Sequence, residues 1–441
     1  MEPESAASRR GFLRRYGVAA AGLAAGAVAA SAPRRPAPSP LPRLGHVVSL
    51  MFHGRSFDDV LGRLYPQGLA PDGLPFDGVT NGMPPDGSPP EPPPYAGSTD
   101  EIMTTPQLPA PGATGSGFTP EMLPVLSALA RGFAVCEAWQ SVPGADAFEN
   151  RRVFHNGPDA AAPSLFARLD RAGLSWRIYV DEAERVSLTA LLHAQELGPR
   201  LSDRLRTMDD LRNDLAEGSL PSYSVVEPRM ILSPNDFEPS ATAGSAGEGP
   251  TRRGRSDARA AEALLHTVYE AIRVSPLAGD TALLVTADTP GVTADHRGSR
   301  VPAVVVSPWS SRGSVVRAQS GHGTAAEVVL GMLGVARSAR ADSVVAPVLR
   351  GILTRQTPRE PRTWPRTTAP FVPRRTASNA SAGAERVTGL GGEVLRLVAR
   401  GTGGPDVRAP ETAAEAAVFL GDNACPHLGG HNATADAQKG I

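Results

Sequence analysis

The sequence predicts an α/β fold in which a central, largely parallel sheet is flanked by helices, and three observations lead to this class. Short apolar runs typical of buried strands occur at 47–51, 176–180 and 282–286. Segments with apolar residues every three or four positions, at 164–172 and 259–272, indicate amphipathic helices. The two kinds of segment alternate along the chain, and such alternation implies parallel strands joined by helical crossovers.

The remaining elements follow from the same signals. Further strands are predicted at 133–136, 222–227 and 301–307, and a further helix at 324–333. Thr119 and Pro120 predict the start of another helix, with Thr119 as its N-cap and Pro120 at its first position. Stretches rich in proline, glycine and polar residues, at 65–118 and 233–255, predict loop-rich insertions between these elements.

Composition sets limits on what the chain does. It has 441 residues, of which 41% are apolar, so a sizeable core is expected. The formal net charge is −1, so no overall positive field would attract nucleic acid, and we expect no nucleic-acid partner. The 2 cysteines, Cys136 and Cys425, are too few for a disulfide scaffold, and the sequence leaves open whether they pair.

The N-terminus resembles an export signal. Arg9 and Arg10 precede Gly11-Phe12-Leu13, and a mildly apolar, alanine-rich run extends to Ala32. Paired arginines with modest hydrophobicity predict export through the twin-arginine route, to the cell envelope or the medium. The chain is therefore divided into a signal peptide (1–32), a linker (33–44), the α/β domain (45–350) and a weakly ordered, Pro/Arg/Gly-rich C-terminal extension (351–441).

Candidate site residues lie where predicted strands end, because ligands of open α/β sheets bind beyond the carboxyl ends of the strands. Asp288 follows the apolar strand 282–286 and is placed for metal ligation or acid–base chemistry. His53 follows the strand 47–51 and, together with Asp58, is a candidate metal or proton-relay pair. Each of these residues also has a plainer interpretation, as a loop side chain that hydrogen-bonds locally.

An ordered series of motifs resembles the bacterial phospholipase C/acid phosphatase phosphoesterase family. It begins with His46-Val47-Val48-Ser49-Leu50-Met51-Phe52-His53-Gly54-Arg55-Ser56-Phe57-Asp58 and continues with Ser141-Val142-Pro143, Asn150-Arg151, Val225-Val226-Glu227-Pro228-Arg229, Val301-Pro302 and His322. The resemblance covers roughly residues 45–335. It implies an alkaline-phosphatase-like fold, a divalent metal and hydrolysis of phosphate esters, often those of phospholipid headgroups.

The departures from the family pattern fall on its reactive positions. The family's Glu-Asn metal pair corresponds to His53-Gly54, and its hydroxyl nucleophile falls at Asp146 or Ala147, neither of which carries a hydroxyl. The family's two loop histidines are missing from 238–242. By resemblance the site residues are Asp146, His296 and His322 as catalytic groups, Asp288 and His53 as metal ligands, and Arg55, Asp58, Asn150 and Asp295 as supporting residues.

Two functional hypotheses therefore remain open. The first is an exported phosphoesterase of the phospholipase C type with a remodelled metal site, in which Asp146 is the nucleophile of a rebuilt site that also contains His53, Asp288 and His322. The second is an inactive family member that binds a phosphorylated ligand, a lipid surface or a protein partner in the same cleft. Phosphoryl transfer needs a nucleophile and cations that stabilise the charge on the phosphoryl oxygens, so the replacements favour reduced or absent activity.

Overall fold

The computed structural model describes residues 41–79, 118–237, 258–291, 295–370, 386–403 and 408–423. All of them belong to the compact unit that runs from Leu41 to Ile441. The predicted signal peptide, residues 238–242 and Cys425 lie outside the described residues, whereas Cys136 is described and has a fully buried thiol. Within the described part of the chain, no helix has the length and apolar character needed to cross a lipid bilayer.

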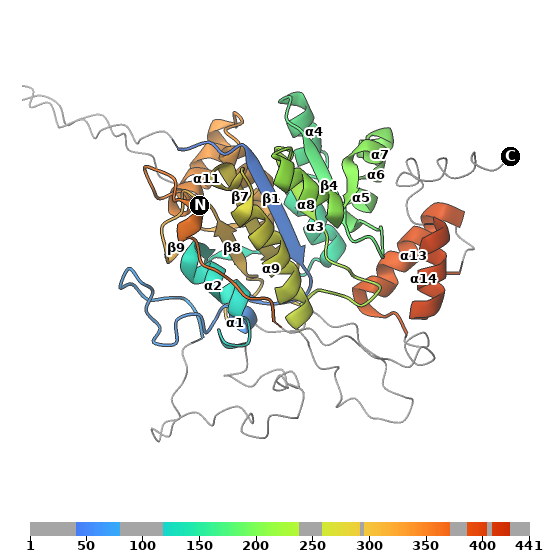
Figure 1. The fold of residues 1–441 in the computed structure, drawn as a ribbon, viewed down its shortest axis with the longest axis horizontal. Helices are drawn as coiled ribbons and strands as arrows, with labels where there is room; N and C mark the ends of the chain where they lie inside the picture. The colour runs from blue at the N-terminus through green and yellow to red at the C-terminus, as the bar shows by residue number, and fades with distance from the viewer. Residues whose placement is uncertain are drawn as a thin grey trace, which may run out of the picture. The chain divides into compact units, whose positions relative to one another are not determined.

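An eight-stranded sheet forms the centre of the described unit (Figure 1). Its spatial order is β5 (Leu205–Thr207), β4 (Trp176–Val180), β6 (Tyr223–Val226), β1 (His46–Phe52), β7 (Thr281–Ala287), β8 (Ala303–Val306), β2 (Ala134–Cys136) and β9 (Ser314–Val316). β8 runs antiparallel to both of its neighbours, and the other pairs are parallel. A separate two-stranded sheet pairs β3 (Trp139–Gln140) with β10 (Ser320–Gly321). The prediction of an α/β fold with a largely parallel sheet is confirmed.

Apolar residues fill the central strands because both faces of the sheet are covered. In β1, Val47 and Met51 point into one hydrophobic core, and Val48 and Leu50 point into the other. β7 repeats this alternation, and all of its residues are buried. A polar side chain within these strands therefore needs a partner, as Ser49 of β1 finds in the Tyr223 hydroxyl (2.8 Å).

Two layers of helices cover the sheet (Figure 1). One core is closed by α3 (Ala147–Asn156), α4 (Leu165–Arg171), α10 (His322–Met332) and α11 (Ala339–Ile352). The other is closed by α2 (Pro124–Gly132), α8 (Met208–Glu217) and α9 (Arg259–Val274). Short connecting helices are α1 (Phe57–Val60), α5 (Leu188–Leu192), α6 (Ala194–Leu197) and α7 (Leu201–Arg204), with 3-10 turns at η1 (Gly198–Arg200), η2 (Ala278–Asp280) and η3 (Pro361–Thr363).

The start of α2 differs from the prediction. The helix begins at Pro124 rather than near Thr119, and proline still occupies its first turn. The buried carboxylate of Glu262, from α9, accepts hydrogen bonds from the N–H groups of Val125 (2.6 Å) and Leu126 (3.0 Å). A cap from a distant helix therefore sets this boundary, and burial raises the pKa of Glu262 to about 7.

The C-terminal extension contains two helices, α13 (Gly389–Gly403) and α14 (Ala413–Asn423), where the sequence predicted only weak order. Their apolar residues share a third cluster with Met230 and Ile231, which follow β6. Val394 and Leu395 of α13 are fully buried there. Packing against the 230–231 segment therefore stabilises α13, whose glycine-rich sequence does not favour a helix by itself.

Candidate functional site

Asp288 and His53 meet at the carboxyl ends of the neighbouring strands β7 and β1. The N–H of Asp288 donates to the carbonyl of Phe52 (2.9 Å), which extends the strand pairing to this point. The His53 Nδ1–H donates to Asp288 Oδ1 (2.9 Å), and the N–H of Gly54 donates to the same oxygen (3.3 Å). Parallel pairing of β1 with β7 is thus what brings the two predicted metal ligands together.

The second oxygen of Asp288 is occupied by Arg151, which projects from α3. Arg151 Nε donates to Asp288 Oδ2 (2.9 Å), and Nη1 donates to Glu227 Oε2 (3.1 Å) beyond the end of β6. Nη2 donates to the carbonyl of Met51 (3.3 Å). Glu227 also accepts hydrogen bonds from Ser187 and Thr189. The three strand ends therefore surround one buried guanidinium.

Neighbouring charges determine the protonation state of Asp288. Burial alone would raise the pKa of Asp288, but the neighbouring His53 and Arg151 lower it well below its ordinary value. Burial would likewise lower the pKa of Arg151, and Asp288 and Glu227 raise it. Asp288 is therefore a carboxylate that accepts hydrogen bonds from His53, Gly54 and Arg151. Asp236 accepts from the backbone N–H of His53 (2.6 Å), and burial raises its pKa to about 7.

His322 is fully buried next to the end of β7, and both of its ring nitrogens have protein partners. Its Nε2–H donates to the carbonyls of Ala287 (3.1 Å) and Asp288 (3.0 Å), and its Nδ1 accepts from the Trp139 indole (3.3 Å). Burial lowers the pKa of His322 to about 4. A neutral imidazole held in this way fixes the end of β7, and its contact with Asp288 is through the backbone carbonyl.

The predicted nucleophile position lies at the start of α3. Asp146 is exposed and caps the helix by accepting from the N–H of Glu149 (2.8 Å). Asn150, one turn later, is buried and holds the preceding turn together through Val142, Ala145 and the carbonyl of Asp146. Asp146 thus has a structural role in the observed geometry, as an ordinary helix cap.

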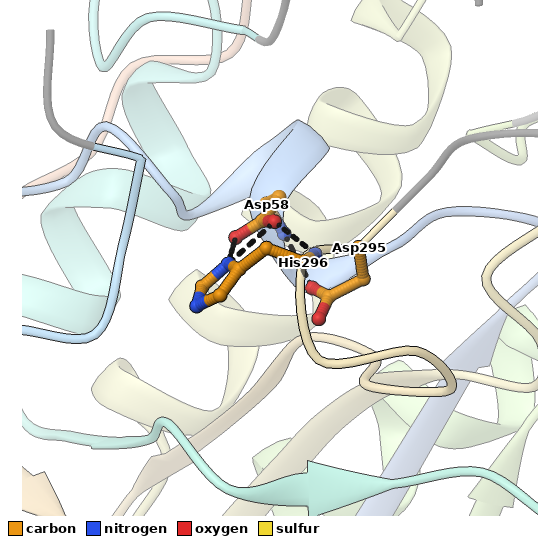
Figure 2. Close-up of side chains that lie close together, drawn as sticks. All are labelled: Asp58, Asp295 and His296. Carbon is orange, nitrogen blue, oxygen red and sulfur yellow. Dashed lines mark hydrogen bonds and ion pairs between the residues drawn. The ribbon is translucent and has the colours of Figure 1, made fainter. Parts of the chain in front are cut away.

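Asp58, Asp295 and His296 form a second cluster, shown in Figure 2. Among the described residues, these three are the group of His, Cys, Asp or Glu side chains whose ligand atoms lie within 4.8 Å of one another. His296 contacts Asp58 through Nδ1 (2.8 Å) and through its backbone N–H (2.7 Å). Asp295 Oδ2 accepts from the N–H of Asp58 (3.1 Å), and burial raises the pKa of Asp295.

Asp146, His53, Asp288 and His322 are all described, and they do not form a group whose ligand atoms all lie within 4.8 Å of one another. The structure therefore does not bring the four residues of the predicted rebuilt site together as one set of metal ligands. The physical reasons are the capping role of Asp146 and the engagement of both His322 nitrogens by protein groups. His53 and Asp288 remain together, but as a hydrogen-bonded pair with Arg151 beside them.

Arg55, predicted as a supporting residue, is buried and holds two loops together. Its guanidinium pairs with Asp59 (3.2 Å) and donates to the carbonyl of Phe237 (3.1 Å). It also lies over the ring of Phe118, 5.6 Å from the centroid. Arg55 therefore connects the segment after β1 with the segment that carries Asp236.

Sequence analysis did not assign roles to the two arginines that organise these clusters. Arg300 is fully buried and donates to Asp58 Oδ1 (2.7 Å) and Asp295 Oδ2 (3.1 Å). Arg151 occurs in a quoted motif beside Asn150, which was the available signal for it. For Arg300 the preceding Asp295-His296 pair is the nearest signal, but nothing in the local pattern predicts a partner 242 residues away.

Comparison with known proteins identifies the family. The Phosphoesterase family model matches residues 97–328, more than half of the chain, and the chain belongs to the Phosphoesterase family. Non-specific phospholipase C5 of Arabidopsis thaliana is 28% identical over 254 residues, which are 47% of this chain and 45% of that protein. Non-specific phospholipase C4 of the same plant is 26% identical over 260 residues, or 47% and 44% of the two chains. The alignments thus span less than half the length of these relatives.

A solved structure with some likeness is that of a protein in the alkaline phosphatase superfamily from Vibrio parahaemolyticus. It has a TM-score of 0.37 and 12% identity over 67% of each chain. Likeness at this level carries no argument about mechanism. The predicted family is confirmed, and the predicted fold class is consistent with it.

A divalent metal, which the family resemblance implies, does not fit the described residues as they stand. At Asp288 a cation would lie against the Arg151 guanidinium, and both carboxylate oxygens already accept hydrogen bonds. At Asp58 and Asp295 the carboxylates are paired with Arg300. The distances permit a metal at Asp58, Asp295 and His296, but the Arg300 guanidinium already lies against the two carboxylates.

Proposed function

We propose that this chain is an exported member of the Phosphoesterase family that binds a phosphate ester, such as a phospholipid headgroup, and has little or no hydrolytic activity. The observation that carries the proposal is the state of Asp288. This carboxylate lies at the strand end where the family resemblance places a metal ligand, and it is held between His53 and Arg151. A protein ion network replaces the reactive centre expected from the resemblance.

The residues at the predicted nucleophile position support the same conclusion. Hydrolysis through a covalent intermediate needs a hydroxyl or an equivalent group activated by a base. The corresponding positions are Asp146, an exposed helix cap, and Ala147. Loss of a nucleophile alone typically lowers turnover by several orders of magnitude.

Binding is proposed at the carboxyl edge of β1 and β7, around His53. The His53 side chain is 18% exposed, and Asp288 fixes its orientation through Nδ1. Because Nδ1–H is already donated to Asp288, the protonated form of this imidazole is the one that donates a hydrogen bond from Nε2 to a phosphate oxygen. The relatives named as phospholipases C suggest which phosphate esters to try.

Titration of the mature protein with phosphocholine and with inorganic phosphate, followed by NMR, tests the binding proposal. We expect saturable binding of phosphocholine that His53→Asn weakens about tenfold or more. His46→Asn is the matched control, because His46 lies at the opposite end of the same strand and bonds the carbonyl of Pro221. Absence of saturable binding, or equal binding by the two variants, would contradict the proposal.

Hydrolysis of phosphate esters is the second candidate, and one observation favours it. The His53–Asp288 pair has the geometry of a general base oriented by a carboxylate. This candidate predicts turnover of p-nitrophenyl phosphorylcholine that disappears in Asp288→Asn. The first candidate predicts the same background rate in both proteins.

Export is proposed from the sequence of the N-terminus. Replacing Arg9 and Arg10 by lysine removes the paired arginines while keeping their charge. We expect this double variant to accumulate unprocessed inside the cell, whereas replacing Arg14 and Arg15 leaves export largely intact. Unchanged export of the first variant would contradict the twin-arginine route.

Sedimentation of the mature protein with phosphatidylcholine vesicles tests the proposed peripheral membrane contact.

A further inference from the structure

We infer that Arg300 is the resident cation of the Asp58–Asp295–His296 cluster, and that the native protein binds no divalent metal through these three side chains. The inference goes beyond the proposed function, because it concerns a different cluster and holds whether or not the protein hydrolyses esters. It rests on which donor already occupies each ligand atom.

Each carboxylate oxygen of the cluster already accepts a hydrogen bond. Asp58 Oδ1 accepts from Arg300 Nη2 (2.7 Å), and Asp58 Oδ2 accepts from the N–H of His296 (2.7 Å). Asp295 Oδ1 accepts from the N–H of Arg297 (2.8 Å), and Asp295 Oδ2 accepts from that of Asp58 (3.1 Å). A metal ion at these oxygens would have to share them with backbone donors and with the Arg300 guanidinium.

The imidazole of His296 is engaged on both sides. Its Nδ1 faces Asp58 (2.8 Å), and its Nε2 faces Asp77 (3.2 Å). A metal-bound histidine must present a nitrogen lone pair to the ion. Here Nδ1 lies against both Asp58 and the Arg300 guanidinium (3.2 Å), and Nε2 lies against Asp77, so each nitrogen is already engaged by protein groups.

Arg300 is also fixed from every side. Nε bonds Asp295 (3.1 Å), Nη1 bonds the Asp77 carboxylate (2.8 Å) and the carbonyl of Glu137 (3.1 Å), and Nη2 bonds Asp58. The guanidinium stacks on Phe57, 4.2 Å from the ring centroid, and its side chain is fully buried. Moving it aside to admit a metal would break all of these contacts together.

Repulsion between cations leads to the same inference. The carboxylates of Asp58, Asp77 and Asp295 face two guanidinium groups, those of Arg300 and Arg297, with Arg297 paired to Asp77 at 2.6 Å. A divalent ion added to this set would meet a buried positive charge at short range. Through Arg300, the cluster therefore joins the segments after β1 and β7 to the segment that leads into β8.

The test compares metal content and thermal stability. We expect purified protein loaded with excess Mn²⁺ or Zn²⁺ and then desalted to carry the same metal content as Asp58→Asn treated identically. We expect the Tm of the native protein to change by less than about 1 °C between metal and EDTA. Stoichiometric metal in the native protein that Asp58→Asn removes would overturn the inference, and this comparison needs no further variant.

Arg300→Met sharpens the test, since it removes the guanidinium and keeps most of the buried volume. We expect this variant to have a lower Tm that rises by about 5 °C or more with Mn²⁺ or Zn²⁺, and the added change Asp58→Asn to abolish the rise. Arg297→Met is the matched control, because Arg297 is 51% exposed. A folded Arg300→Met protein that does not respond to metal would overturn the assignment of Arg300 as the group that excludes it.

Discussion

Replacing Arg151 by methionine tests the ion network at the strand ends. Methionine keeps most of the side-chain volume but leaves the carboxylates of Asp288 and Glu227, which are 0% and 1% exposed, without their cation. Removing one partner of a buried ion pair costs about 3–5 kcal/mol. This range applies without reduction because both carboxylates are buried, so water does not screen them as it screens surface pairs. We therefore expect the free energy of unfolding to fall by about 3–5 kcal/mol at pH 7.

The pH dependence of that loss gives a second check. His53 and Arg151 together hold the pKa of Asp288 below its ordinary value, so removing Arg151 leaves His53 alone to oppose burial, and the pKa of Asp288 rises from its native value. A carboxyl group with a depressed folded pKa contributes stability above its unfolded pKa and loses that contribution as pH falls through the folded pKa. The deficit of Arg151→Met relative to the native protein should accordingly be larger at pH 7 than at pH 3.

Urea unfolding followed by circular dichroism measures both quantities. Arg152→Met is the matched control, because the neighbouring Arg152 is 22% exposed and pairs with Glu149 on the surface of the helix. We expect it to change stability by less than about 1 kcal/mol. The reasoning is refuted if Arg151→Met unfolds within 1 kcal/mol of the native protein, or if its deficit is the same at both pH values.

Three other predictions follow from buried groups. The pKa of His322 is about 4 in the fold, against 6.5 for an unperturbed histidine. The contribution of neutral His322 to the free energy of unfolding is therefore complete above pH 6.5 and falls by about 3 kcal/mol towards pH 4. Urea unfolding of His322→Gln should show a flatter pH profile between pH 6.5 and pH 4. Glu262→Ala should cost about 1–3 kcal/mol in urea unfolding because two N–H groups of α2 lose their acceptor, while Glu262→Gln should cost less. Leu395→Ala should lower stability by about 2–4 kcal/mol at a fully buried position, against less than about 0.5 kcal/mol for Val418→Ala at a position 68% exposed, if unfolding of the C-terminal helices is cooperative with the sheet.

The sheet could be predicted because its signals are local. The apolar run at 47–51 and the run at 282–286 need burial on both faces, and only a covered sheet provides it. The strand-end rule also brought His53 and Asp288 to the same edge. The antiparallel direction of β8 was not predictable, because an apolar strand has the same pattern in either direction.

The partners of the site residues could not be predicted because they are distant in sequence. Arg151 contacts Asp288 across 137 residues, and Arg300 contacts Asp58 across 242. An ordinary arginine in a loop or helix carries no local sign of such a partner. The same reason explains the boundary of α2, where Glu262 caps the helix from α9. Family resemblance located the reactive positions, and the structure supplied the groups that now occupy them.

Release of p-nitrophenol from p-nitrophenyl phosphorylcholine by the mature protein is the measurement that decides between lost and retained hydrolytic activity. The assay compares the native protein with Asp288→Asn, with and without added Mn²⁺, Zn²⁺ and Ca²⁺. We expect the two proteins to give the same background rate under every condition. Turnover by the native protein that a metal stimulates and that Asp288→Asn abolishes would contradict the proposed loss of hydrolytic activity.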